Sequence, residues 1–166
     1  MNPEHLHLAL NHIPIIGLAC SLVPIVAGIL ARNKTAMVAG LVLAAVCGWT
    51  TPAVMETGEM AYERYESGSV RRYLDPDIKD TLEMHEHRAE KGSVVFYVTA
   101  VLATISLGLA LWRFEAGRWA AILTALACLA SVVAGVWIAD SGGKIRRVDF
   151  RDNAPGKLPA VEDGTY

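Results

Sequence analysis

Hydrophobic and polar positions are strongly segregated along this chain. Four long stretches contain no Asp, Glu, Lys or Arg, and together they make up nearly half of the sequence. These stretches are residues 13–31, 36–55, 93–112 and 119–139. About 20 helical residues reach about 30 Å, which is the thickness of the hydrocarbon core of a bilayer. The pattern therefore predicts four membrane-spanning helices.

The polar segments between these stretches have very unequal lengths. Residues 32–35 and 113–118 are short, so we expect spans one and two, and spans three and four, to form antiparallel hairpins. Residues 56–92 form a long polar loop, and residues 140–166 are expected to be an irregular C-terminal tail. The predicted fold is all-α: a four-transmembrane-helix bundle over residues 1–139, with a helical extramembrane loop between the second and third helices.

Local signals add detail to this outline. Asp75-Pro76-Asp77 combines an N-cap, a proline at the first helical position and an early acidic residue, which predicts a helix that runs through Lys91 into the third span. Pro24 lies inside the first span and Pro52 near the end of the second. Each proline removes a backbone donor, so we expect a kink at both positions.

Composition and charge agree with a membrane protein. The 166 residues are 53% hydrophobic, above the usual fraction for soluble domains, and the net charge of −2 gives no reason to expect nucleic-acid binding. The lipid bilayer is therefore the first expected partner. The 3 cysteines all lie in apolar stretches without a C-x-x-C-H motif, so neither disulfides nor covalently attached haem is indicated.

The distribution of basic residues predicts an orientation. Arg32, Lys34, Arg113 and Arg118 concentrate positive charge in the two short loops, which the positive-inside tendency places in the cytoplasm. Both termini and the long loop would then lie outside, in the periplasm. The basic cluster that begins at Lys144 favours the opposite orientation.

The histidines are the main candidates for chemistry. All 5 lie on one side of the membrane, next to the starts of spans one and three. Imidazoles and carboxylates at membrane level are commonly functional and commonly face the interior of the bundle. At about 100° per residue, His85 falls on the stripe of Leu82 and Ala89 that continues into the apolar core, whereas His87 points away from it. His12 shares a face with Ile16, and we expect this face to point inward too.

Two imidazoles from facing helices are the axial ligands of a low-spin b-type haem. We therefore predict that His12 and His85 approach each other and bind haem b. Arg88 and Arg146, with Lys144 and Arg147 nearby, are expected to pair with the haem propionates. The alternative without a cofactor is a hydrogen-bonded histidine cluster at headgroup level.

The carboxylates support a second hypothesis, a non-haem metal centre. Nitrogen and oxygen ligands in combination suit zinc, manganese or iron. The candidate ligands are His7, His12, Glu59, His85 and Glu86. An acidic stripe also follows the second span if its helix continues past Gly58, although such a stripe is equally typical of a solvated helix face. The Glu-x-x-His pairs of di-iron bundles are absent at the expected places.

Several short motifs, taken in order, resemble a family of small four-span prokaryotic membrane proteins of unknown function. They are His7-Leu-Ala-Leu-Asn-His12-Ile-Pro14, Thr57-Gly58-Glu59, His85-Glu86 and Gly142-Gly143-Lys144-Ile145-Arg146. Some relatives carry a fused Rieske iron–sulfur domain, which implies redox partners. Relatives often have His where Arg147 stands here, so a site that uses this position as a ligand would be incomplete.

The resemblance implies a multi-pass protein of the bacterial inner membrane. Together with the histidines, it leads us to expect an electron carrier, or a haem-bearing subunit of an electron-transfer complex, rather than a stand-alone enzyme. Expected partners are a membrane or periplasmic redox protein or a quinone, within a homo-oligomer or a larger complex. A cofactor-free structural subunit whose long loop and tail bind a partner is the remaining alternative.

Overall fold

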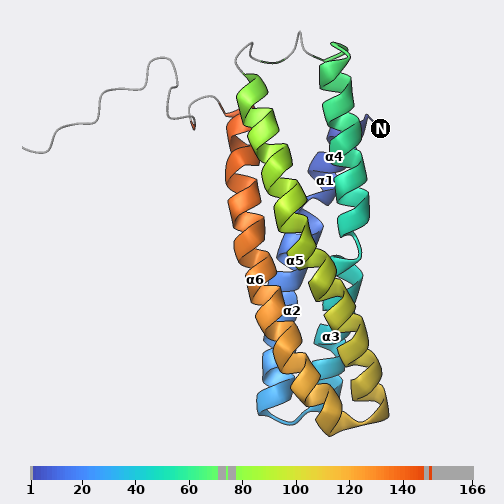
Figure 1. The fold of residues 1–166 in the computed structure, drawn as a ribbon. Helices are drawn as coiled ribbons and strands as arrows, with labels where there is room; N and C mark the ends of the chain where they lie inside the picture. Colours follow the sequence, from blue (N-terminus) through green and yellow to red (C-terminus); the bar gives the residue numbers. More distant parts are fainter. Residues whose placement is uncertain (1, 71–73, 75–77, 148–149, 151–166) are drawn as a thin grey trace, which may run out of the picture.

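The computed structural model describes residues 2–70, 74, 78–147 and 150, and within these residues it contains helices and no strand. The helices are α1 (Pro3–Leu10), α2 (His12–Leu30), α3 (Lys34–Gly48), α4 (Thr51–Glu66), α5 (Lys79–Trp112) and α6 (Phe114–Arg146). The first four join end to end in pairs, so the chain forms four long helical rods (Figure 1). All four rods are long and apolar enough to cross a membrane, which confirms the predicted helical bundle.

Proline explains where two of the rods are interrupted. A proline inside a helix cannot donate to the carbonyl four residues earlier, and its ring clashes with that carbonyl. Pro14 stands four residues after Leu10, where α1 ends, and Pro52 stands four residues after Gly48, where α3 ends. Pro24 is different, because it lies inside α2 without ending the helix.

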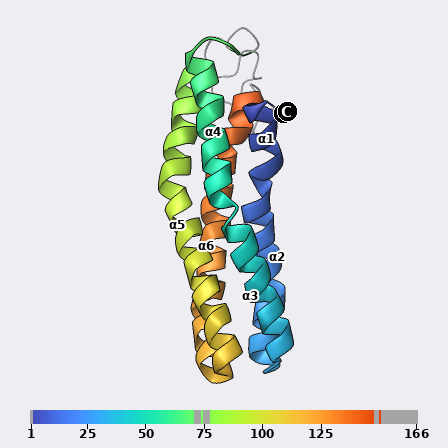
Figure 2. The same cartoon turned by 90° about the vertical axis from the view of Figure 1, so that its right-hand side faces the viewer.

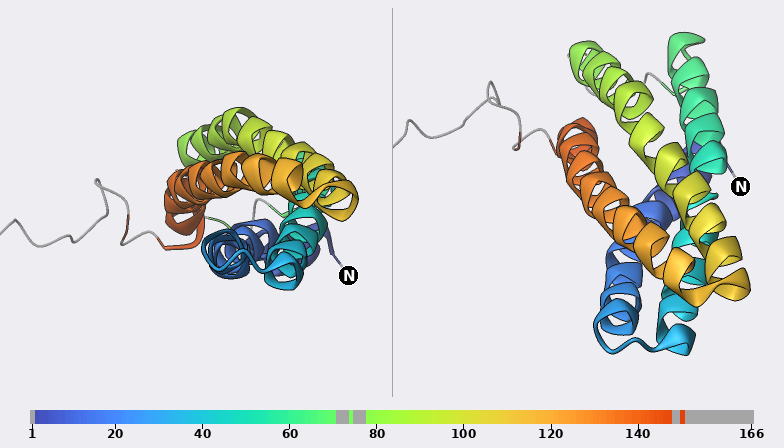
Figure 3. Two further views of the ribbon diagram at one scale, coloured as in Figure 1. Left: turned by 90° about the horizontal axis from the view of Figure 1, so that it is seen from below. Right: turned by 60° about the horizontal axis from the view of Figure 1, so that its bottom comes forward.

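The rods are arranged as two antiparallel hairpins that pack face to face. Helices α1 to α4 form the first hairpin and α5 and α6 the second, and the two appear as separate layers when viewed along the bundle (Figure 3, left). Figure 2 shows α4 beside α1 at one end of the molecule and α3 beside α2 at the other. At the end with the short connections, Arg32 Nη2 lies 2.9 Å from Glu115 Oε1, which links the two hairpins.

Small and weakly polar residues line much of the interior of the bundle, beside a few large buried side chains such as Leu18, Ile25 and Met37. Hydroxyl groups pair across the α5–α6 interface, with Thr99 Oγ1 2.8 Å from Ser131 Oγ and Ser106 Oγ 2.8 Å from Thr124 Oγ1. Gly28 packs directly on the backbone of Met37, so α2 and α3 approach closely. Large apolar side chains instead cover the outside of the rods. This arrangement is typical of helices that pack within lipid, where small residues allow close contact.

The helices extend beyond the charge-free stretches. Most of the polar segment 56–92 is helical, because α4 continues to Glu66 and α5 begins at Lys79. Helix α6 continues to Arg146, so the first seven residues of the expected irregular tail are helical. The predicted cap at residues 75–77 and most of the remaining tail, residues 148–149 and 151–166, lie outside the described part of the chain.

Candidate functional site

Two histidines meet between the hairpins, at the end of the bundle opposite the short connections. His7 lies on α1 and His85 on α5, and both side chains are half-buried. Their ring centroids are 6.4 Å apart, and their ring planes are inclined by 82°. Each hairpin therefore contributes one imidazole to a common site.

On the first hairpin, α4 fixes the position of His7. The Nδ1 atom of His7 lies 3.0 Å from the carbonyl oxygen of Val54. Thr57 donates its hydroxyl to the same carbonyl at 3.0 Å and to that of Ala53 at 2.8 Å. A Cβ atom at Gly58 would lie 3.0 Å from Cε1 of His7, so the imidazole packs directly on the glycine.

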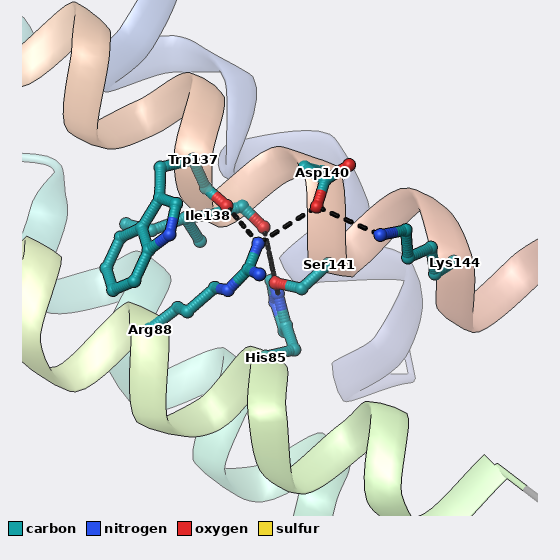
Figure 4. A network of polar contacts seen from close by, with 7 residues as sticks. All are labelled: His85, Arg88, Trp137, Ile138, Asp140, Ser141 and Lys144. Atoms are coloured by element: carbon teal, nitrogen blue, oxygen red, sulfur yellow. Dashed lines mark hydrogen bonds and ion pairs between the residues drawn. The ribbon is translucent and has the colours of Figure 1, made fainter. Parts of the chain in front are cut away.

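On the second hairpin, α6 holds His85 in the same way. The Nδ1 atom of His85 lies 3.3 Å from the carbonyl oxygen of Ile138 and 3.1 Å from Oγ of Ser141 (Figure 4). Ser141 donates its hydroxyl to the carbonyl of Ile138 at 2.7 Å. A Cβ atom at Gly142 would lie 3.0 Å from Cε1 of His85.

The carbonyl contacts favour the tautomer of each ring that carries its proton on Nδ1. A carbonyl oxygen only accepts hydrogen bonds, so each bond requires a proton on Nδ1 and leaves the lone pair of Nε2 available. Histidines that bind metals usually donate their other ring N–H to a carbonyl or carboxylate, which orients the ring and makes it a better ligand. In this tautomer, Nε2 is the ring nitrogen that has a lone pair for a ligand bond.

The expected propionate partners lie close to His85. The guanidinium of Arg88 donates from Nη1 to the carbonyl of Trp137 and to Oδ2 of Asp140, both at 2.9 Å, and lies 5.1 Å from the centroid of the Trp137 ring (Figure 4). Lys144 contacts the same carboxylate at 3.3 Å. Arg88 is thus bound to α6, while Arg146 is the last residue of α6 and its side chain lies outside the described part.

The prediction that His12 faces the interior of the bundle is wrong. His12 is exposed on α2, and its neighbour on the predicted face, Ile16, is exposed as well. The buried stripe of this rod runs through Pro14 and Leu18 and, one heptad before Pro14, reaches His7. This stripe can be followed in the sequence from the apolar core back to the N-terminus. It identifies His7 as the histidine that faces the interior.

The carboxylates do not complete a non-haem metal centre. Glu59 is exposed, as are the other members of the acidic stripe on α4, Glu56, Glu63 and Glu66. Among the residues that the structure describes, no three His, Cys, Asp or Glu side chains come together in a group that could hold a metal ion. The acidic stripe on α4 is therefore a solvated helix face.

Sequence reasoning did not recognise Thr57 and Ser141 as parts of the site. Each hydroxyl residue directly precedes the glycine that contacts a histidine, and each bonds to the carbonyl that this histidine also contacts. The signal is present in the sequence as two similar pentapeptides, Val54-Met-Glu-Thr-Gly58 and Ile138-Ala-Asp-Ser-Gly142. Their common pattern is a branched apolar residue, any residue, an acid, a hydroxyl residue and glycine.

Comparisons with models of protein families, with curated proteins and with solved structures found no match to this chain. The family resemblance described above stays a prediction for that reason. What the site does has to be inferred from the geometry of its own residues.

Proposed function

We propose that this protein is an integral membrane b-type haem protein in which His7 and His85 are the axial ligands. The separation of their rings is the observation that carries the proposal. With a metal–nitrogen bond of about 2 Å and about 1 Å from the nitrogen to the ring centre, two axial imidazoles have centres about 6 Å apart. The 6.4 Å between the ring centroids of His7 and His85 agrees with this spacing.

The surroundings of the two rings also suit a haem. Both rings have a carbonyl partner on Nδ1, as expected of metal-binding histidines. The two hairpins pack against each other mainly through α2, α3 and the apolar halves of α5 and α6, and much less where α4 faces α5. A flat cofactor between the hairpins at this end would therefore displace little of the existing packing.

A bound haem would supply one-electron redox chemistry, because two axial imidazoles leave iron no open position for a substrate. We therefore favour an electron carrier, or a haem-bearing subunit of an electron-transfer complex, over a stand-alone enzyme. The expected electron partners are a quinone or a periplasmic redox protein. The basic short loops and the family resemblance favour the bacterial inner membrane, with the histidine site on the periplasmic side.

The absorption spectrum of the full chain tests this proposal. We expect protein purified in detergent from haem-replete cells to show a Soret band, and dithionite reduction to sharpen the α and β bands of a six-coordinate b-type haem. Protein that shows no Soret band under these conditions would contradict the proposal and favour a cofactor-free structural subunit.

Histidine variants separate the ligands from their neighbours. His7→Ala and His85→Ala are each expected to lose haem or to give a high-spin spectrum, because one axial bond is missing. His12→Ala and His87→Ala are matched controls, since both residues are exposed at the same end of the bundle. If His12→Ala lost haem while His7→Ala retained the spectrum of the unaltered protein, the ligand assignment would be wrong.

A further inference from the structure

The two halves of the histidine site are repeats of one local structure. In each half, a histidine contacts a glycine on the neighbouring helix and the carbonyl four residues before that glycine. In each half, the residue before the glycine is Thr57 or Ser141, whose hydroxyl donates to that carbonyl. Two independent copies of the same arrangement make a chance contact a poor explanation for either.

The repeat continues into the apolar bundle. Burial follows the same spacing from each histidine. The positions 7, 11, 14, 18 and 21 residues after His7, from Pro14 to Gly28, are all buried. The positions at the same distances after His85, from Gly92 to Ser106, are buried as well. Counting the same distances back from Gly58 and from Gly142 again reaches only buried residues. Any helix bundle has a heptad pattern. In this protein the heptad pattern of each hairpin also has the same spacing from its histidine, so His7 and His85 occupy equivalent positions.

In each half, the hydroxyl residue and the imidazole share one carbonyl acceptor, although Thr57 also donates to the carbonyl of Ala53 at the shorter distance of 2.8 Å. Each of these carbonyls lies inside a helix, so it accepts the backbone N–H four residues later and its two lone pairs are shared with the hydroxyl and with the histidine ring. On the second hairpin, Ser141 Oγ also lies 3.1 Å from Nδ1 of His85, so its oxygen guides the ring directly. With the glycine against Cε1, each ring is fixed from two sides.

We propose that Thr57 and Ser141 are equivalent positioning residues, which fix the planes of His7 and His85 nearly at right angles through the carbonyls of Val54 and Ile138. The effect of the two hydroxyl groups on the haem-bound protein rests on the proposed function. The angle between axial imidazole planes determines the electron paramagnetic resonance (EPR) spectrum of a low-spin ferric haem. Perpendicular planes give one dominant low-field feature, whereas parallel planes give a rhombic spectrum with several resolved features.

EPR spectra of hydroxyl-deletion variants test the haem-bound state. We expect the unaltered protein to give the dominant low-field feature, because its ring planes are inclined by 82°. Thr57→Val and Ser141→Ala should each shift the signal of the haem that remains bound toward the rhombic form. Thr57→Ser and Ser141→Thr restore the hydroxyl and should restore the signal. Thr50→Val is the matched control, since Thr50 bonds the carbonyl of Cys47 three residues earlier.

Nuclear magnetic resonance of ring nitrogens tests the same role without haem. In the haem-free full chain, both imidazoles are expected to carry the proton on Nδ1. Thr57→Val should change the tautomer signal of His7 alone, and Ser141→Ala that of His85 alone. Unchanged EPR and nitrogen spectra in both variants would overturn the positioning role. Absence of haem from the unaltered protein would instead overturn the proposed function, and the nitrogen spectra would then decide the positioning role by themselves.

Discussion

At Gly58 and Gly142 the side chain is a single hydrogen atom, and a histidine ring fills the space that a methyl group would take. A larger residue would press on Cε1, the ring atom next to the nitrogen that we propose as a haem ligand. The site therefore depends on these glycines as much as on the hydrogen bonds to Nδ1. Interactions of this kind around metal ligands commonly change metal affinity by about 10- to 100-fold.

The neighbouring glycines of α6 provide a matched test at the residue scale. We expect Gly142→Ala to weaken haem binding about tenfold, because its Cβ would lie 3.0 Å from Cε1 of His85. Gly143→Ala should bind haem normally, since the nearest atom to its Cβ is 3.8 Å away on Phe150. Haem titration of the two haem-free variants measures both affinities. Equal affinities would show that the contact with His85 does not matter.

At this scale the sequence predicted His85 as a haem ligand but named His7 only as a candidate ligand of a non-haem metal centre. His85 follows the apolar stripe of a single uninterrupted helix, so its direction could be calculated from residue spacing. His7 and His12 lie on opposite sides of the break between α1 and α2. Their faces could be assigned only by following the buried stripe back from the core. The contacts with Val54 and Gly58 depend on how α4 packs beside α1, which residue spacing within one helix does not determine.

At the scale of the helices, the charge-free stretches predicted the four spans because charge is costly in the hydrocarbon core. They did not predict where the helices end, since a helix that leaves the membrane continues into water when its polar side chains are solvated. Helix α5 has 34 residues, and only its second half coincides with the charge-free stretch. The break before α4 follows from the position of Pro52, where a kink was expected.

Close contact between α2 and α3 gives a prediction about stability. Gly28→Ala should lower the free energy of unfolding by about 1–3 kcal/mol, because its Cβ would collide with the backbone of Met37. Gly108→Ala should be neutral or stabilising by up to about 1 kcal/mol, since its Cβ meets no atom within 4 Å and alanine favours the helix. Unfolding in mixed detergent micelles measures both. Equal stabilities would show that the first hairpin adapts to the added methyl group.

For the molecule as a whole, the rods are longer than the membrane is thick. The 34 residues of α5 extend about 51 Å, whereas a hydrocarbon core measures about 30 Å. His85 precedes the charge-free stretch by eight residues, or about 12 Å along the helix. This spacing predicts that the histidine site lies at the level of the headgroups, outside the part of the bundle that is embedded in the hydrocarbon core.

Labelling from one side of the membrane tests the proposed orientation. A cysteine introduced by Ser69→Cys lies at the same end as the histidines, and one introduced by Ala116→Cys lies in the first turn of α6 at the other end; both positions are exposed. We expect a membrane-impermeant maleimide added to intact spheroplasts to label the first variant and not the second. The reverse pattern would place the histidine site in the cytoplasm.

The position of the histidines at one end limits the route that an electron can take. All 5 histidines lie at the end of the bundle with α1 and α4, and hydroxyl pairs lie in the interior of the other half. With one haem between His7 and His85, the other half of the described bundle would offer no histidine for a second haem through which charge could cross the bilayer. Such a protein would receive and return electrons at the same surface, and its turnover would not respond directly to the membrane potential.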